Sequence, residues 1–374
     1  MSITLNFPGN ARIRAQLERL ATTGQLGGSY LFEGPRGAGQ ERAALELAAW
    51  KITGTPDPAQ EDAARVLRYI HPDLIYVMPV VPKGSPGNMG DDDWMASFRE
   101  FQALRGSDPL LPIEFKSNPR ISVKGMRAVR GELAKMAYEG QGRALIIRDA
   151  DMMETTTQDA LLKTLEEPPR NTLIILISHR PEALRETVRS RCQRLVFEPL
   201  DETLIRGELE SRGLDVERAE FFAALSGGDM EEAVLLAESE SEEGNARLAR
   251  REAWLDILDT CEFGNEVEMI EAIQAFAKEG AGKEKKNPTQ VRVEFMNLAL
   301  SWYHDLLGLR TRGALRAHRD QEARSERYGR LDESSLAERL QKFEKARGQI
   351  QGYANVQLTL LALFLSLRAA GARQ

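Results

Sequence analysis

The stretch RALIIRDADMMETTTQDALLKTLEEPPRNTLIILISHRPEALRETVRSRC, residues 143–192, decides the fold of this chain. It contains two uninterrupted apolar runs, at 144–147 and 172–177, which predict strands buried on both faces of a sheet. Helices are predicted at 156–165 and 182–187, and a further strand at 194–197. Strands that alternate with helices indicate an α/β fold, a mainly parallel sheet covered by helices on both faces.

The same alternation begins nearer the start of the chain. The pattern predicts a helix at 11–20, a strand at 30–32, a glycine-rich loop at 33–40 and a helix at 42–52. A glycine-rich loop between a strand and a helix is the setting of a phosphate-binding loop, GxxxxGK[ST]. In such a loop, backbone N–H groups hold the phosphates, the lysine reaches the terminal phosphates and the hydroxyl binds magnesium. A strand at 74–78 and a helix at 126–138 complete the predicted elements of this region.

The glycine-rich loop departs from the working pattern at its chemical positions. Gly34 and Gly39 are kept, but Gln40 and Glu41 stand where the lysine and the hydroxyl residue belong. A carboxylate close to a polyphosphate in a partly desolvated pocket costs on the order of several kcal/mol. We interpret the loop as a relic phosphate-binding loop that does not bind ATP tightly; the alternative is a plain tight turn before a helix.

An acidic motif follows the buried strand at 144–147. Asp149 and Asp151 stand where a Walker B motif would orient magnesium, but the glutamate that would polarise an attacking water does not follow closely, and Glu154 lies further on. Two interpretations stay open for Asp149. It is either a relic of the Walker B site or, as we favour, a residue that caps the next turn.

Composition limits the possible classes. A chain of 374 residues with a net charge of -7 is expected to form two or three domains and is not a general polyanion binder. Cys192 and Cys261 cannot form a four-cysteine cluster, so no metal site is expected from them. We found no signal peptide and no apolar run long enough to span a bilayer, so the expected location is the cytoplasm.

The strand pattern stops near residue 199, and the rest of the chain is predicted to be helical. We expect a sheet domain at 1–199 with an insertion at 79–119, rich in Pro, Gly and Asp, that lies on the surface and carries a short helix at 94–104. Short helices separated by glycines at 200–240 predict a small lid. Residues 241–374 predict an all-α domain. The acidic stretch 238–243 is either a linker or a solvated helix face.

The motifs DAD, ALLKTLEEPP, ILIS and RSRCQRLVF, all within residues 149–197, together resemble the bacterial clamp-loader ATPase family. Weaker matches extend to SYLFEGPRGAG at 29–39, HPDL at 71–74, ISVKGMR at 121–127 and ANVQLTLLALFLSL at 354–367. The resemblance implies an AAA+ RecA-like sheet domain, a small helical lid and a C-terminal helical collar. Relatives often carry a four-cysteine zinc knuckle before the HPD motif, and residues 52–70 contain no cysteine.

Within that family, motor subunits keep the loop lysine, and the delta prime subunit of DNA polymerase III has lost it. This chain resembles the delta prime type. The segment GDMEEA at 228–233 resembles the family's sensor 2 motif, GxxRxA, but has Glu231 in place of the arginine. Gln40, Glu41 and Glu231 each make the pocket less favourable for ATP, so no nucleotide cofactor is expected. Ser178 matches the sensor 1 position and is expected only to hydrogen-bond the loop.

The resemblance also gives Arg191, in the SRC motif, a role. In ring-forming ATPases of this type, such an arginine reaches the γ-phosphate bound to a neighbouring subunit and stabilises the transition state, which is worth ~10³ or more in rate. Arg191 is therefore the expected arginine finger, and the alternative is a surface salt bridge. Cys192 is expected to be a packed apolar residue. Arg127 and Arg130, on one helix face, are either DNA contacts or ordinary solvated arginines.

The implied function is that of a stator subunit of a pentameric clamp loader. Its partners would be motor subunits of the gamma/tau type and a delta subunit, with primed DNA inside the assembly and the sliding clamp touched indirectly or transiently. Two alternatives stay open. The chain is an ATP-binding motor subunit of the same family, or it is an adaptor outside replication that uses the same fold for docking.

Overall fold

The computed structural model describes residues 3–81, 89–108, 110, 119–238, 242–278, 288–351 and 354–371. The chain divides into two compact units. The first contains residues 1–205 and the short segment 228–232, and the second contains residues 206–227 and 233–374. The three-part division at residues 199 and 240 therefore stays a prediction. Within the described residues, no helix has both the length and the apolar character needed to cross a membrane.

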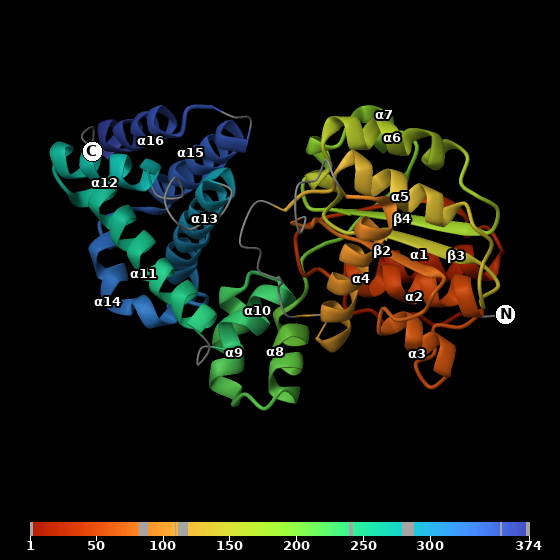
Figure 1. The fold of residues 1–374 in the computed structure, drawn as a ribbon. Helices are drawn as coiled ribbons and strands as arrows, with labels where there is room; N and C mark the ends of the chain where they lie inside the picture. Colours follow the sequence, from red (N-terminus) through yellow and green to blue (C-terminus); the bar gives the residue numbers. More distant parts are fainter. Residues whose placement is uncertain are drawn as a thin grey trace. The chain divides into compact units, whose positions relative to one another are not determined.

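The first unit is built on a five-stranded sheet with the order β2-β3-β4-β1-β5 (Figure 1). Every neighbouring pair in the sheet is parallel. The strands are β1 (Gly28–Glu33), β2 (Leu74–Val77), β3 (Arg143–Ile147), β4 (Thr172–Ser178) and β5 (Gln193–Val196). Nearly all residues of the first four strands are buried, as continuous apolar runs require when helices cover both faces. The predicted AAA+ α/β architecture is confirmed.

Helices cover both faces of this sheet. In Figure 1, α2 and α3 lie on one side of the strands, and α5 and α6 lie on the other. The helices of this unit are α1 (Ala11–Thr22), α2 (Gln40–Thr53), α3 (Glu61–Leu67), α4 (Asp91–Ser107), α5 (Val123–Leu133), α6 (Thr155–Glu166) and α7 (Glu186–Arg189). α2 packs against β3 and β4, and α5 packs against α6. The loop that follows β1 is thereby fixed at the carboxyl edge of the sheet, where ligands bind in open α/β folds.

The helix predicted at 182–187 is wrong. The segment forms a single 3-10 turn (Pro181–Ala183) and the short helix α7. Leu184, between them, has extended backbone, and its side chain is 1% exposed. Burial of this leucine in the core of the unit interrupts the helical pattern that the local sequence favours.

The insertion differs from expectation in a way that bears on the site. Its helix α4 is longer than predicted, and Trp94 and Phe98 are fully buried, at 0% and 1% exposure. α4 packs against α5 and β2. A Cβ at Gly125 in α5 would lie 3.0 Å from Trp94 and 3.1 Å from Phe98, so glycine permits this close approach. α4 is part of the core and not a surface helix; residues 82–88, 109 and 111–118 of the insertion lie outside the described residues.

The described residues of the second unit are helical, as predicted for the C-terminal part. Its core gathers large aromatic side chains from several helices, among them Trp254, Trp302, Tyr328 and Phe343. Residues 239–241 and 279–287 lie outside the described residues, so the acidic stretch is described only from Glu242 onward. The later helices are α8 (Glu202–Ser211), α9 (Val216–Leu225), α10 (Met230–Ala237), α11 (Glu242–Phe263), α12 (Glu266–Lys278), α13 (Pro288–Arg312), α14 (Glu322–Ser325), α15 (Glu333–Gln351) and α16 (Val356–Gly371).

Candidate functional site

The glycine-rich loop joins the end of β1 to the start of α2. Gly34, Gly37 and Gly39 have φ values of +143°, +60° and +92°, which side-chain-bearing residues rarely adopt. Gln40 is the first residue of α2, and its Nε2 donates a hydrogen bond to the Pro35 carbonyl oxygen at 2.6 Å. Its side chain is turned into the loop itself and is 2% exposed. Gln40, at the position where a phosphate-binding loop has its lysine, thus hydrogen-bonds within the loop through a neutral amide.

The acidic segment 228–232 lies directly on this loop. The Met230 amide donates to the Gly37 carbonyl oxygen at 3.3 Å, and a Cβ on Gly37 would overlap the Asp229 carboxylate. The Leu200 amide donates to the Gly228 carbonyl oxygen at 3.1 Å, which fixes the other end of the segment. The segment and the loop belong to the same compact unit. The start of α10 therefore brings its acidic residues to the glycine-rich loop.

Two carboxylates and two guanidinium groups form a buried network beside the loop. Arg105 Nη2 lies 2.6 Å from Glu41 Oε2 and 3.2 Å from Glu231 Oε1. Arg148 pairs with Glu41 through Nη1 and with Glu231 Oε2 through Nη2 at 2.7 Å. The side chains of Arg105 and Arg148 are 1% and 8% exposed, and both carboxylates are 15% exposed. We call these four residues the charge network.

The network is supported by further hydrogen bonds and by its own electrostatics. Tyr69 donates from its hydroxyl to Glu41 Oε1 at 2.7 Å, and Tyr76 donates to the same oxygen. Burial alone would lower the pKa of Arg148, but the carboxylates of Glu231 and Glu41 outweigh it and raise that pKa well above its usual value. Burial and then the Glu41 carboxylate raise the pKa of both tyrosines well above 10.0. Arg148 therefore stays charged and the two tyrosines stay hydrogen-bond donors.

The two aspartates predicted at the Walker B position, Asp149 and Asp151, are also held by internal partners. Asp149 Oδ1 lies 3.0 Å from Arg36 Nη2 and 3.2 Å from His179 Nε2. Burial would raise the pKa of Asp149, but Arg36, His179 and Arg148 together hold it well below its usual value. Asp149 precedes a 3-10 turn with φ 50°, yet its side chain makes no capping hydrogen bond. The favoured capping role is therefore wrong, because the carboxylate is bound to Arg36 and His179 and not to the turn.

The sensor 1 position lies beside the second aspartate. Ser178 Oγ donates to Asp151 Oδ1 at 3.3 Å, and Arg180 Nη2 lies 2.9 Å from Asp151 Oδ2. Ser178 also connects to the loop through its backbone, since the Gly34 amide donates to the Ser178 carbonyl oxygen at 3.3 Å. The predicted contact of Ser178 with the loop is thus made by its carbonyl group, and its hydroxyl serves Asp151.

The SRC motif lies apart from the loop, immediately before the edge strand β5. Arg191 Nε donates to Glu166 Oε1 at 2.6 Å, and its Nη1 donates to the Thr187 carbonyl oxygen at 2.8 Å. The side chains of Arg191 and Glu166 are 33% and 46% exposed. Cys192 is partly buried against the core, and burial raises the pKa of its thiol to about 12, which agrees with a packed rather than a reactive cysteine.

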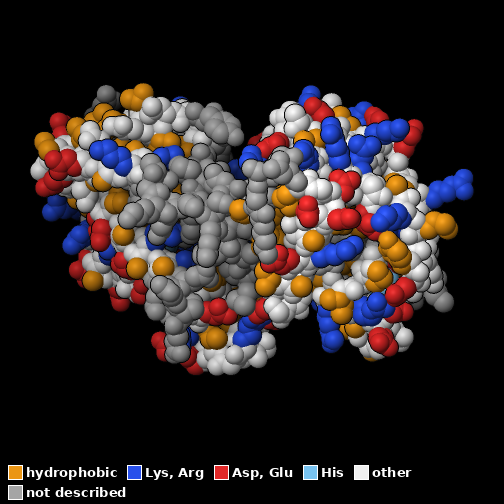
Figure 2. Space-filling view, viewed as in Figure 1, with side chains coloured by type: hydrophobic (Ala, Val, Ile, Leu, Met, Phe, Trp, Pro, Cys, Tyr) orange, Lys and Arg blue, Asp and Glu red, His pale blue; other side chains and the backbone are white. Residues whose placement is uncertain are grey.

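The predicted DNA-contacting arginines are on α5. Arg127 is exposed, and Arg130 Nη1 donates to the Ala160 carbonyl oxygen at 3.2 Å. Arg130 thus connects α5 to α6. Figure 2 shows acidic and basic side chains interspersed over the described part of the viewed face. DNA contact by these arginines stays a prediction.

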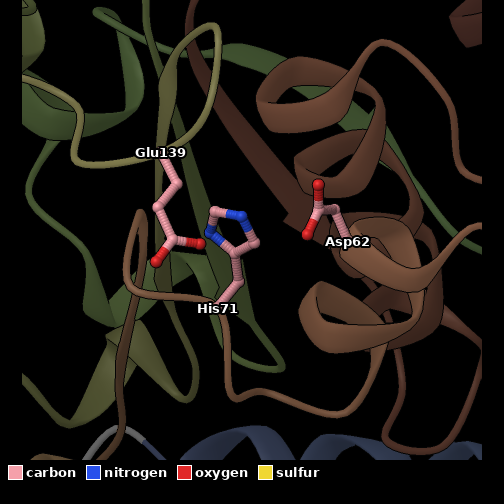
Figure 3. A group of neighbouring side chains, drawn as sticks. All are labelled: Asp62, His71 and Glu139. Carbon is pink, nitrogen blue, oxygen red and sulfur yellow. The ribbon is translucent and has the colours of Figure 1, made fainter.

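A separate group of side chains, of the types that can bind a metal ion, lies outside the loop. Figure 3 shows His71 between Asp62 and Glu139, and their ligand atoms lie within 4.8 Å of one another. Arg65 Nη1 already lies 3.2 Å from Asp62 Oδ1 and 2.6 Å from Glu139 Oε2. A guanidinium group thus supplies the positive charge that these carboxylates need, and the group is explained as an ion-pair cluster.

Sequence reasoning found Glu41 and Glu231 but missed both arginines of the charge network. Arg148 follows four apolar residues of β3. A charged residue at the end of a buried strand could have indicated from the sequence that Arg148 has a buried partner. Arg105 gave no such signal, because it lies 64 residues from Glu41 and 126 residues from Glu231 along the chain.

Comparisons with known proteins agree on one family. A family model described as "DNA polymerase III, delta subunit" matches residues 9–201, just over half of the 374-residue chain. The delta' subunit of DNA polymerase III from Bacillus subtilis is 28% identical over 230 residues, which cover 60% of this chain and 59% of that protein. The delta' subunit of Pseudomonas aeruginosa is 36% identical over 111 residues, or 29% of this chain and 34% of that protein.

Other relatives are more distant. The tau subunit of Bacillus subtilis DNA polymerase III is 27% identical over 238 residues, which cover 61% of this chain and 36% of that protein. The matches thus span less than two thirds of the length of these relatives. Among solved structures, a gamma subunit-related protein of Thermotoga maritima aligns over 95% of this chain and 99% of its own, with 16% identity and a TM-score of 0.38. That degree of similarity adds nothing to the assignment.

The parallel sheet, its glycine-rich loop and the acidic end of β3 define an AAA+ type of domain. The chain belongs to the DNA polymerase III delta-subunit family, a family of clamp-loader subunits.

Proposed function

We propose that this chain is a delta prime-like stator subunit of a cytoplasmic clamp loader. In this proposal it assembles with gamma/tau-type motor subunits and a delta subunit to place the sliding clamp on primed DNA. It neither binds nor hydrolyses ATP at its own loop. Instead, Arg191 reaches the nucleotide bound to a neighbouring motor subunit and stabilises the charge that develops there during hydrolysis.

The charge network is the observation that carries the proposal. At a working site, cations from the loop and the lid surround phosphate groups. Here Glu41 and Glu231 put carboxylates at those two places, and Arg105 and Arg148 neutralise them. A polyphosphate would have to displace both carboxylates from Arg105 and Arg148 and leave them buried without a guanidinium partner, which is costly. Arg191, in contrast, is one-third exposed before the edge strand, where a partner can reach it.

The test is clamp- and DNA-stimulated ATP hydrolysis by motor and delta subunits from the same organism. This chain is added as wild type or as Arg191→Ala. We expect wild type to restore turnover and Arg191→Ala to lower it by roughly 10³-fold per affected site, with assembly unchanged. Arg185→Ala is the matched control, because Arg185 lies close to Arg191 in the chain, is 44% exposed and, like Arg191, pairs with a carboxylate of α6, that of Asp159. The control should keep full turnover.

Several outcomes would contradict the proposal. Turnover that does not depend on Arg191, in an assembly that contains the variant chain, would remove the finger role. Failure to assemble with any loader subunit would favour the adaptor interpretation. Heat of binding on titration of magnesium-ATP into the isolated chain would favour a motor subunit, because the proposed stator gives none.

A further inference from the structure

The four members of the charge network come from four separate elements. Glu41 lies in the first turn of α2, Arg148 directly follows β3, Glu231 lies in the first turn of α10 and Arg105 lies in the last turn of α4. Each arginine contacts both carboxylates, and each carboxylate contacts both arginines. The network therefore ties the loop helix and the start of α10 to two anchors inside the same unit.

The four charges of the network sum to zero, and removal of any single member leaves a net charge. Buried ionic groups are stable when their charges balance and their hydrogen bonds are made, and removal of one member leaves an uncompensated charge. Without Arg105, Glu41 and Glu231 would share a single guanidinium group. Without Glu231, Arg105 would lose its Glu231 contact, and Arg148 would keep Glu41 and the Asp149 carboxylate, 3.4 Å from its Nε. In both cases the segment 228–232 loses an attachment to the loop.

The arrangement inverts the charges of a nucleotide site. There, a bound polyanion attracts cationic side chains from the loop and the lid. Here the two arginines supply the charged groups that are bound, and carboxylates from the loop helix and from α10 contact them. The Met230 amide also donates a hydrogen bond to the Gly37 carbonyl oxygen at 3.3 Å, which joins the two segments directly.

We infer that Arg105 and Arg148 act as a built-in ligand that holds segment 228–232 closed on the glycine-rich loop in the absence of nucleotide. We call this closed arrangement of segment 228–232 on the loop the latch. Helix α4 of the insertion contributes to the latch through Arg105, which completes the charge balance of the network. Trp94 and Phe98 are buried in the core and fix the position of α4. The position of the Arg105 guanidinium group is thereby fixed as well.

Hydrogen exchange of the full chain tests the latch, with peptides that cover residues 228–237 as the readout. We expect Arg105→Met and Glu231→Gln each to speed exchange there by at least about tenfold, because each leaves an uncompensated buried charge. The double variant, Arg105→Met with Glu231→Gln, should exchange more slowly than either single variant, because Glu41 and Arg148 remain as a balanced pair. Arg120→Met is the control, since Arg120 and Glu154 form an exposed pair, at 55% and 42% exposure.

The inference is overturned if Arg105→Met leaves the exchange rate of residues 228–237 unchanged. It is also overturned if the increase in exchange rate in the double variant equals the product of the increases in the two single variants. If Arg105→Met does not fold, the double variant must recover folding, and failure to do so also overturns it. The result is separate from the role of Arg191. Protection of residues 228–237 by magnesium-ATP in the wild type would instead contradict the proposed function, whatever the variants show.

Discussion

Asp229, at the start of α10, shows how a single residue of the relic site affects stability. Burial and the neighbouring Glu231 carboxylate raise the pKa of Asp229 from 3.8 to about 6. The native state thus binds the proton more tightly than the unfolded state. The resulting loss of stability is fully present above about pH 6, decreases as the pH falls and is absent below 3.8. At neutral pH the ionised carboxylate costs about 3 kcal/mol.

Asp229→Asn should therefore stabilise the chain at pH 7.5 by about 3 kcal/mol, measured as the free energy of unfolding in urea. Asn keeps the hydrogen bond that Asp229 Oδ1 accepts from the Glu232 amide at 3.0 Å. The gain should disappear near pH 4. Asp215→Asn, at the exposed N-cap of α9, is the control and should change stability little. A gain that is equal at both pH values would contradict the assigned cause.

The same scale shows what sequence could and could not predict about the site. The substitutions at Gln40, Glu41 and Glu231 were predicted from the loop and lid motifs, because those motifs fix which chemical group belongs at each position. The partners of the two carboxylates could not be predicted, since Arg105 and Arg148 reach Glu41 from 64 and 107 residues away. Contacts of that range depend on how the elements pack, which local patterns do not specify.

At the scale of elements, the parallel strands were the most predictable part. Their uninterrupted apolar runs reflect burial on both faces, and the observed strands agree with the predicted ones to within a residue or two. α4 was misjudged because the Pro, Gly and Asp residues around it indicate a surface loop. Its buried face depends on Trp94 and Phe98, whose neighbours come from α5 and β2.

The packing of α4 gives a prediction at this scale. Phe98→Ala should lower the free energy of unfolding by about 3–5 kcal/mol, because it removes a fully buried ring and leaves a cavity. Leu104→Ala is the matched control in the same helix, since Leu104 is 51% exposed, and it should change stability by less than about 0.5 kcal/mol. Urea unfolding at constant m-value measures both. Equal, small effects would show that α4 does not pack into the core.

At the scale of the whole molecule, the two units should respond differently to mild acid. In the second unit, burial and then the Arg251 charge lower the pKa of His318 from 6.5 to about 3. Arg251 Nη2 donates to His318 Nδ1 at 2.9 Å, so Nε2 carries the proton and donates to Ser301 Oγ at 3.1 Å. The neutral ring is favoured in the native state. Its stabilisation is complete above pH 6.5 and is lost as the pH falls toward 3.

The first unit has opposing groups in the same pH range. Burial lowers the pKa of His71, so that unit loses stability below pH 6.5, while protonation of Asp229 returns stability below about 6. These two contributions to stability act in opposite directions between pH 7.5 and 5.0. In the second unit, the loss from His318 is about 2 kcal/mol over the same interval. Acidification should therefore lower the free energy of unfolding of the second unit more than that of the first unit.

Urea unfolding at pH 7.5 and 5.0, read by pulse-labelling mass spectrometry at one fixed labelling pH, measures the units separately. Peptides of α13 should show a lower urea midpoint at pH 5.0, and peptides of β3 and β4 should change little. His318→Gln should remove most of the pH dependence of α13, because glutamine does not titrate. His304→Gln, at an exposed position of the same helix, should leave it intact. A pH dependence that survives His318→Gln would assign the acid sensitivity to other groups.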